Sequence, residues 1–186
     1  MGRQPPTYFT REPGGTPTAE RVREVVLDAG LEMDAWTEAY LYAAARADHA
    51  RLFILPRLMR GENVVCDRYL DSSLAYQGFG RGLGVEAVQD LNAYAVGIVV
   101  PDRTFYLRLD EAERVRRARM IGAPPDRIER SGGDFTRRVE EGFEELVRRD
   151  PNRIRALDAA RPPKELAEAV IRDMEAASPY TPTDGA

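Results

Sequence analysis

The stretch TYFTREPGGTP (Thr7–Pro17) joins a short β-like run to the start of a helix. Aromatic and β-branched residues open it, as is typical of a strand. Thr16 suits a helix N-cap, and Pro17 suits the first helical position. Between these lie Gly14 and Gly15, which allow backbone N–H groups to approach an anion. The stretch therefore predicts a strand, an anion-binding loop and a helix.

Outward from this stretch, apolar runs of strand length alternate with segments of helical period. The strands are expected at 7–10, 63–67, 104–109 and 153–157. The helices are expected at 17–29, 34–60 with a kink at Pro56, 85–96, 111–121, 135–149 and 163–177, with a short helix within 68–77 and a loop at 78–84. This alternation predicts an α/β fold with a mainly parallel sheet flanked by helices. Residues 1–177 are expected to form one domain, and residues 178–186 a disordered tail.

Composition narrows the possible functions. The 186 residues carry a net charge of −4, which argues against a nucleic-acid partner. One cysteine, Cys66, and one histidine, His49, exclude an internal disulfide and a Cys/His zinc site. No run of 18 apolar residues or secretory leader is visible, so no membrane partner and a cytoplasmic location are expected.

Charged residues follow two of the predicted strands, where ligands bind in parallel sheets. Arg11 and Glu12 follow the first, and either face a crevice or form a surface salt bridge; the residues leave both readings open. Asp67 and Arg68 follow the second strand. A carboxylate there can hold a hydrated magnesium ion, and an arginine can bind a phosphate. In an isolated pair of this kind, however, the carboxylate and the arginine more often pair with each other.

Three other segments carry groups suited to a nucleotide. Tyr42 and Arg46 are four residues apart and share a helical face, which suits stacking on a base as well as an ordinary alanine-rich helix. A hydroxyl-rich face is expected from Ser72, Ser73 and Tyr76. The arginine-rich stretch at about 116–133 resembles a mobile lid, with a solvated helix face as the plainer alternative.

The motifs taken together resemble bacterial thymidylate kinase. They are TREPGGT, LYAAARADH, CDRYLDSSLAYQGFGRGL, PDRTFYLRLD, DRIE and LDAARPPKEL, in this order from about Phe9 to about Ile171. The resemblance implies a three-layer fold like that of the P-loop kinases. It also implies phosphoryl transfer from ATP to dTMP, giving dTDP, with Mg²⁺ and as a homodimer.

The resemblance assigns the charged groups first. Arg11 and Arg68 would grip the phosphate of the acceptor nucleotide. Glu12 and Asp67 would order the magnesium ion through water and serve in catalysis. Tyr42 stands where the family usually has a phenylalanine that stacks on thymine, so the aromatic ring is kept and a hydroxyl group is added.

The remaining acceptor residues follow in the same way. Arg46 would bond the thymine carbonyl edge. Ser72, Ser73, Tyr76 and Gln77 would line the sugar and base, with Tyr76 leaving no room for a ribose 2′-hydroxyl. Some family members carry asparagine at the position of Ser73.

The donor side follows the family less well. Arg119 and Arg127 would sit in the lid as catalytic arginines, and residues 159–162 would lie near adenine. The family opens with a strand, a G-x-x-x-x-G-K-[ST] loop and a helix, whereas the one lysine here, Lys164, lies outside any such loop. We therefore expect a clipped version of a full enzyme that lacks its central first strand and has little kinase activity. The alternatives are a nucleotide-binding regulatory protein and a deoxynucleoside kinase.

Overall fold

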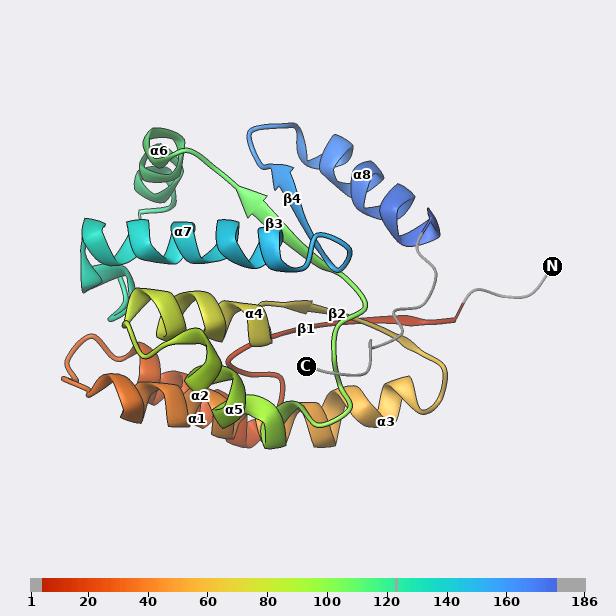
Figure 1. Cartoon of the computed structure of the whole chain (residues 1–186), viewed down its shortest axis with the longest axis horizontal. Helices are drawn as coiled ribbons and strands as arrows, with labels where there is room; N and C mark the ends of the chain where they lie inside the picture. Colours follow the sequence, from red (N-terminus) through yellow and green to blue (C-terminus); the bar gives the residue numbers. More distant parts are fainter. Residues whose placement is uncertain (1–4, 123, 177–186) are drawn as a thin grey trace. The chain divides into compact units, whose positions relative to one another are not determined.

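The computed structural model describes residues 5–122 and 124–176, and in the described residues each strand pair is parallel. The chain divides into two compact units, residues up to 100 with 125–143, and residues 101–124 with 144 onward. Each unit contains one pair of strands with helices packed around it (Figure 1). The α/β class with parallel strands is therefore confirmed. The predicted tail at 178–186 lies outside the described residues.

The first unit is built on β1 (Thr7–Arg11) and β2 (Asn63–Asp67), which pair in parallel. Its helices are α1 (Pro17–Leu27), α2 (Ala35–His49), α3 (Leu55–Leu58), α4 (Leu70–Ser73) and α5 (Val85–Val96). Two π-helical segments, η1 (Ala50–Ile54) and η2 (Leu74–Gly80), continue α2 and α4, and η3 (Glu129–Ser131) is a short 3₁₀ turn. Helix α7 (Gly133–Arg149) begins in this unit.

The second unit contains β3 (Thr104–Arg108) and β4 (Ile154–Asp158), again parallel, with α6 (Glu111–Ile121) and α8 (Pro163–Ala176). Arg103 and Arg155 both bond to Asp173, which ties the strand pair to α8. The predicted lid segment, about 116–133, is shared between the units: α6 belongs to the second, and residues from 125 belong to the first.

Helix starts follow local capping chemistry, which the sequence predicted for α1. Thr16 caps α1 by accepting a hydrogen bond from the Ala19 amide at 3.2 Å, with Pro17 at the first helical position. Asp34 caps α2 through the amides of Trp36 and Thr37. These caps explain why both helices begin within one residue of the predicted positions.

One local expectation is corrected, and the expected kink at Pro56 stays a prediction. The predicted kink at Pro56 is preceded by the π-helical segment η1, where the Leu55 amide bonds to the Ala50 carbonyl. A π-helical turn shifts the hydrogen-bond register, and proline cannot donate to the usual one. The predicted loop at 78–84 is wrong in part, because Gly78 and Gly80 belong to η2.

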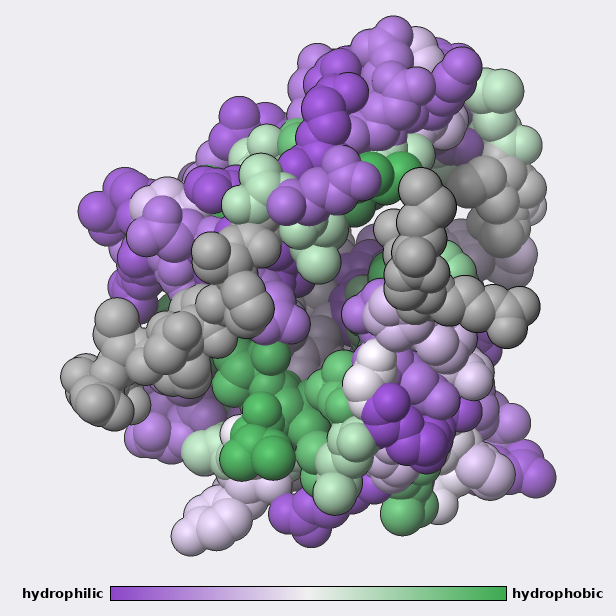
Figure 2. Space-filling view, turned by 90° about the vertical axis from the view of Figure 1, so that its right-hand side faces the viewer, coloured by the Kyte–Doolittle hydropathy of each residue, from purple (hydrophilic) through white to green (hydrophobic). Residues whose placement is uncertain are grey.

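One hydrophobic cluster of the first unit lies between η1, α5 and the turn after β2. Its buried members are Ala50, Ile54, Tyr69, Val96 and Val99. Several large apolar side chains stay exposed, among them Phe9 and Met59. Figure 2 shows apolar atoms gathered in patches among hydrophilic ones on the face that it draws. Across the described residues, every helix falls short of the length or apolar character that crossing a bilayer requires.

Candidate functional site

The carboxyl ends of β1 and β2 meet, as the sequence predicts for parallel strands. Arg11 is the register partner of Asp67, and the Glu12 amide donates to the Asp67 carbonyl at 2.9 Å. Arg68 follows at once, with a φ of 66° that is uncommon for a residue with a side chain. This edge of the strand pair therefore presents Arg11, Asp67 and Arg68 together, each of them exposed.

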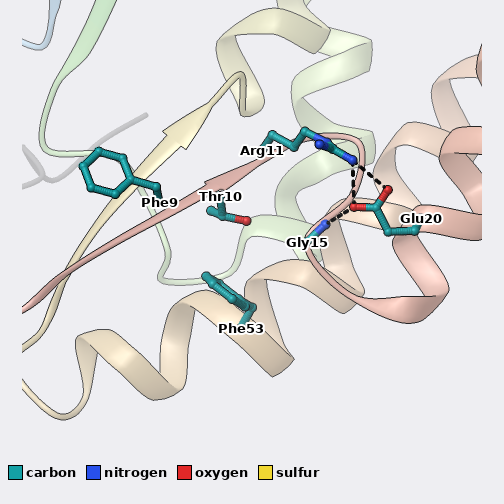
Figure 3. Close-up of a pocket in the computed structure, with 6 residues that line it drawn as sticks. All are labelled: Phe9, Thr10, Arg11, Gly15, Glu20 and Phe53. Atoms are coloured by element: carbon teal, nitrogen blue, oxygen red, sulfur yellow. Dashed lines mark hydrogen bonds and ion pairs between the residues drawn. The ribbon is translucent and has the colours of Figure 1, made fainter.

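A pocket of about 400 Å³ opens beside Arg11, and Figure 3 shows the six residues that line it. Arg11 Nη2 lies 3.1 Å from Glu20 Oε2, and the Gly15 amide donates to Glu20 Oε1 at 3.0 Å. The backbone hydrogen bond from Gly15, with help from Arg11, lowers the pKa of Glu20. The anion that accepts from the glycine loop in this structure is thus the protein's own Glu20.

Arg23 belongs to the same neighbourhood, and the sequence reasoning missed it. Its Nη1 donates to the Pro13 carbonyl at 2.9 Å, and its charge also lowers the pKa of Glu20. The available signal was the spacing, because Arg23 lies three residues after Glu20 on α1 and so shares its face. Two guanidinium groups, those of Arg11 and Arg23, therefore act on the loop.

The structure corrects the expectation for Glu12. Its side chain is buried, at 3% exposed, and does not accompany Arg11 into the crevice. Oε2 accepts from Arg46 Nε at 2.8 Å, and Oε1 lies 3.0 Å from His49 Nδ1. Neighbouring residues leave a strand on opposite sides, so one of the two faces the interior.

Magnesium does not fit Glu12 in this arrangement. Both of its carboxylate oxygens already have partners, and in the described chain no group of three or more His, Cys, Asp or Glu side chains is placed to hold a metal ion. Of the two predicted metal ligands, only Asp67 is exposed.

Arg46 is also placed differently from the prediction. It is 2% exposed and donates to Glu12, to Ser73 Oγ at 2.9 Å, to Asn92 Oδ1 and to the Tyr69 carbonyl at 3.2 Å. Four of the five N–H donors of Arg46 are thereby used within the protein. Asn92, on α5, is a member of this network that the sequence reasoning missed.

A second buried network surrounds Glu38, one turn before Tyr42 on α2. Its carboxylate accepts from Gln77 Nε2 at 2.8 Å, from Arg81 Nη2 at 2.9 Å and from Arg127 Nη1 at 2.8 Å. Arg127 was expected to be a catalytic lid arginine, but its side chain is only 11% exposed and Nε donates to the Val26 carbonyl. The sequence reasoning missed Glu38 and Arg81.

Tyr42 lies close to this network. Burial raises the pKa of its phenol to about 12, and the charge of Glu38 adds to the rise, while those of Arg127 and Arg68 oppose it. The guanidinium of Arg68 lies 5.1 Å from the centre of the Tyr76 ring. The structure therefore brings Tyr42, Arg68 and Tyr76 into one neighbourhood.

The other predicted residues divide between the two units. Ser73 and Gln77 are buried and bond to Arg46 and Glu38, whereas Ser72 is half-buried. Arg119 is exposed on α6, which belongs to the second unit. In that second unit, the Ala159 amide donates to the Arg108 carbonyl at 2.8 Å.

Comparisons with known proteins agree on one family. A family model described as thymidylate kinase matches residues 1–170. The thymidylate kinase of Pelotomaculum thermopropionicum is 45% identical over 171 residues, which cover 91% of this chain and 79% of that protein. That of Deinococcus radiodurans is 49% identical over 157 residues, covering 84% and 76%. A crystal structure of thymidylate kinase from Ehrlichia chaffeensis matches with a TM-score of 0.70 at 29% identity, covering 90% of this chain and 79% of that one.

Proposed function

The chain belongs to the thymidylate kinase family, and from this premise we propose that it binds dTMP at the β1–β2 edge as the acceptor of a phosphoryl group from ATP. In this reaction an oxygen of the dTMP phosphate attacks the terminal phosphorus of ATP, and the bond to ADP breaks. Such a transfer depends mainly on positioning and charge neutralisation rather than on covalent chemistry by the protein.

One observation carries the acceptor side of this proposal. Arg11 and Arg68 come from adjacent strand ends, with Arg11 in register with Asp67. Arginine forks bind phosphate oxygens through charge-assisted hydrogen bonds. The left-handed backbone at Arg68, where φ is 66°, is an uncommon conformation of the kind that clusters at functional sites. Both arginines are exposed and can turn toward a ligand.

The roles of the other residues follow from where they lie. Tyr42 would stack on the thymine base and Tyr76 would border the sugar, next to Arg68. Ser73, Gln77 and Arg46 would support the wall of the binding site from the protein interior. Their polar groups bond to other protein groups, since Arg46 donates to Ser73 and Gln77 donates to Glu38. Ser72 would lie at the rim of the site.

The donor side remains a set of predictions. Arg119 would reach the transferring phosphoryl group, and Asp67 would act on Mg²⁺ through water; Glu12 is left out because Arg46 and His49 hold its carboxylate. Arg127 keeps only a supporting role, since it is held by Glu38. A homodimer in the cytoplasm is the expected form of the protein.

Calorimetry with dTMP tests the acceptor site directly. We expect Arg68→Gln to weaken dTMP binding by at least about tenfold, because a hydrogen bond to a charged group is worth roughly 1.5–3 kcal/mol. Arg21→Gln is the matched control, since Arg21 is exposed on α1 and pairs with Glu24 there. Equal dTMP affinity of the Arg68→Gln variant and the wild type, or no binding by the wild type, would overturn the proposal.

A second candidate is binding of dTMP without transfer. It is favoured by the position of the one lysine, Lys164, which lies on α8 rather than in a phosphate-binding loop. A coupled assay for ADP separates the two candidates. ADP release that depends on dTMP supports the kinase, whereas dTMP binding with no ADP release supports the binding protein.

A further inference from the structure

Glu38 is a fully buried carboxylate that faces two arginines. It is 0% exposed, and Arg81 and Arg127 both donate to its Oε2. Gln77 completes the set by donating to Oε1 at 2.8 Å. These hydrogen bonds outweigh the effect of burial, so the pKa of Glu38 lies below its usual value. The carboxylate stays ionised at neutral pH.

Glu38 and its partners come from three separate segments of the first unit. Glu38 itself lies on α2, Gln77 and Arg81 lie at the end of η2, and Arg127 lies just before η3. Arg127 also donates from Nε to the Val26 carbonyl at 2.8 Å and from its amide to the Leu27 carbonyl at 3.3 Å. One carboxylate therefore joins these segments to each other and, through Arg127, to the end of α1.

This network extends to the groups assigned to the acceptor site. Arg81 lies over the Phe135 ring at 4.3 Å, and Phe135 meets the Tyr76 ring edge-on at 6.0 Å. The Tyr76 ring in turn lies 5.1 Å from the Arg68 guanidinium. On the other side, the charges of Glu38 and Arg127 act on the phenol of Tyr42.

We propose that Glu38 is a positioning residue for the acceptor nucleotide. Its bonds hold residues 126–131 and the end of η2 against α2, an arrangement called the Glu38 latch below. The latch keeps in place the wall of the binding site that faces the thymine base. The inference rests on the proposed function. Glu38 has no exposed surface and does not touch the ligand. Its effect is therefore on the base-side wall and should not depend on the phosphate.

The test compares two ligands in calorimetry, dTMP and thymidine, which differ only in the phosphate. We expect Glu38→Gln to weaken both by the same factor, about tenfold, because the guanidinium groups of Arg81 and Arg127, 20% and 11% exposed, lose their counter-charge. The dissociation constant of thymidine divided by that of dTMP should stay as in the wild type. Arg68→Gln should instead reduce this ratio, since it removes a phosphate contact and so weakens the binding of dTMP alone.

A second readout needs no ligand. In Glu38→Gln, the Arg127 amide should exchange its hydrogen at least about tenfold faster than in the wild type, as expected when a local contact opens. The Glu12 amide, bonded to the Asp67 carbonyl, reports opening of the strand pair and should change less. Glu24→Gln is the matched control because Glu24 is exposed and pairs with Arg21 on the same helix.

The variant Arg127→Met removes the other partner of the Glu38–Arg127 pair. It replaces Glu38→Gln in the same measurements if Glu38→Gln does not fold. We expect the double variant to lose less affinity than the sum of the two single losses, since the two residues act on each other. Additive losses, a loss for dTMP alone, or unchanged exchange at Arg127 would overturn the inference. If the wild type binds neither ligand, the proposed function and the nucleotide role both fail, and the exchange data still decide whether the latch exists.

Discussion

Arg46 Nε lies 2.8 Å from Glu12 Oε2, and the two side chains are 2% and 3% exposed. Glu12 directly follows the strand residue Arg11, and Arg46 belongs to α2, 34 positions later. His49 bonds to the other oxygen of the same carboxylate. The loop after β1 is thereby joined to α2 through a buried, hydrogen-bonded charge pair.

Loss of the Glu12 charge should destabilise the fold severely. Glu12→Gln leaves the Arg46 guanidinium buried without its counter-charge, and breaking a buried pair from one side costs about 3–5 kcal/mol. Urea unfolding at pH 7 measures the change. The exposed pair of Glu24 and Arg21 is the comparison, where Glu24→Gln should cost less than about 1 kcal/mol. Similar losses in the two variants would show that the Glu12 pair does not support the fold.

The glycine loop should be intolerant of a methyl group at one position in particular. Gly15 has a φ of +85°, and a Cβ there would meet His49 Nε2 at 2.5 Å and Thr10 Oγ1 at 2.6 Å. We expect Gly15→Ala to cost the left-handed penalty of about 1–2 kcal/mol and, in addition, about 1–3 kcal/mol for overpacking. Gly61→Ala isolates the first of these, because Gly61 has a φ of +72° with no atom within 4 Å of its Cβ position. Equal unfolding midpoints for the two variants would contradict the predicted clash.

Glu38 should make the stability depend on pH in the acid range. Burial by itself would raise the pKa of Glu38, but hydrogen bonds from Arg81, Gln77 and Arg127 lower it below 4.5. A depressed pKa in the folded state stabilises the protein above the unfolded pKa, and this contribution is lost as the pH falls through the folded value. Urea midpoints from pH 6 down to pH 3 should therefore fall more steeply for the wild type than for Glu38→Gln. Parallel curves would rule out this contribution.

The phenol of Tyr42 should titrate late. Burial raises its pKa to about 12, so the neutral form is favoured in the folded chain. The stability that this supplies is present below the unfolded pKa of about 10 and is lost as the pH rises through the folded value. Absorbance at 295 nm, recorded at pH 11 on folded protein, should be nearly the same for the wild type and Tyr42→Phe. A clear drop in the variant would show that Tyr42 ionises like an exposed tyrosine.

Much of the fold could be predicted because it rests on local signals. The order of strands and helices followed from hydrophobic period, and Thr16 with Pro17 marked the start of α1 through capping chemistry. The placing of Arg11 and Asp67 at carboxyl ends of parallel strands followed from a rule for such sheets, whereas their pairing came from the structure. The helical form of residues 78–80 was missed, since glycines at alternate positions are typical of a loop.

The candidate site was predicted less completely, and the misses have a common cause. Glu12 and Arg46 were expected to face a ligand, but each is buried against the other. Glu38 and Arg81 gave no signal in their own surroundings, because their pairing joins residues 43 positions apart. From sequence alone a charged residue is expected to be exposed, because it is buried only when a partner elsewhere in the chain pairs with it.

The sequence alone determined the alternation of strands and helices, the helix caps, and which strand ends carry arginines, because period and capping depend on residues a few positions apart. The tertiary structure alone decided which charges face solvent and which are buried in pairs. Glu12 and Glu38 show why: the cost of burying a carboxylate is offset only by donors that the fold brings from distant segments, Arg46 and His49 for one and Gln77, Arg81 and Arg127 for the other.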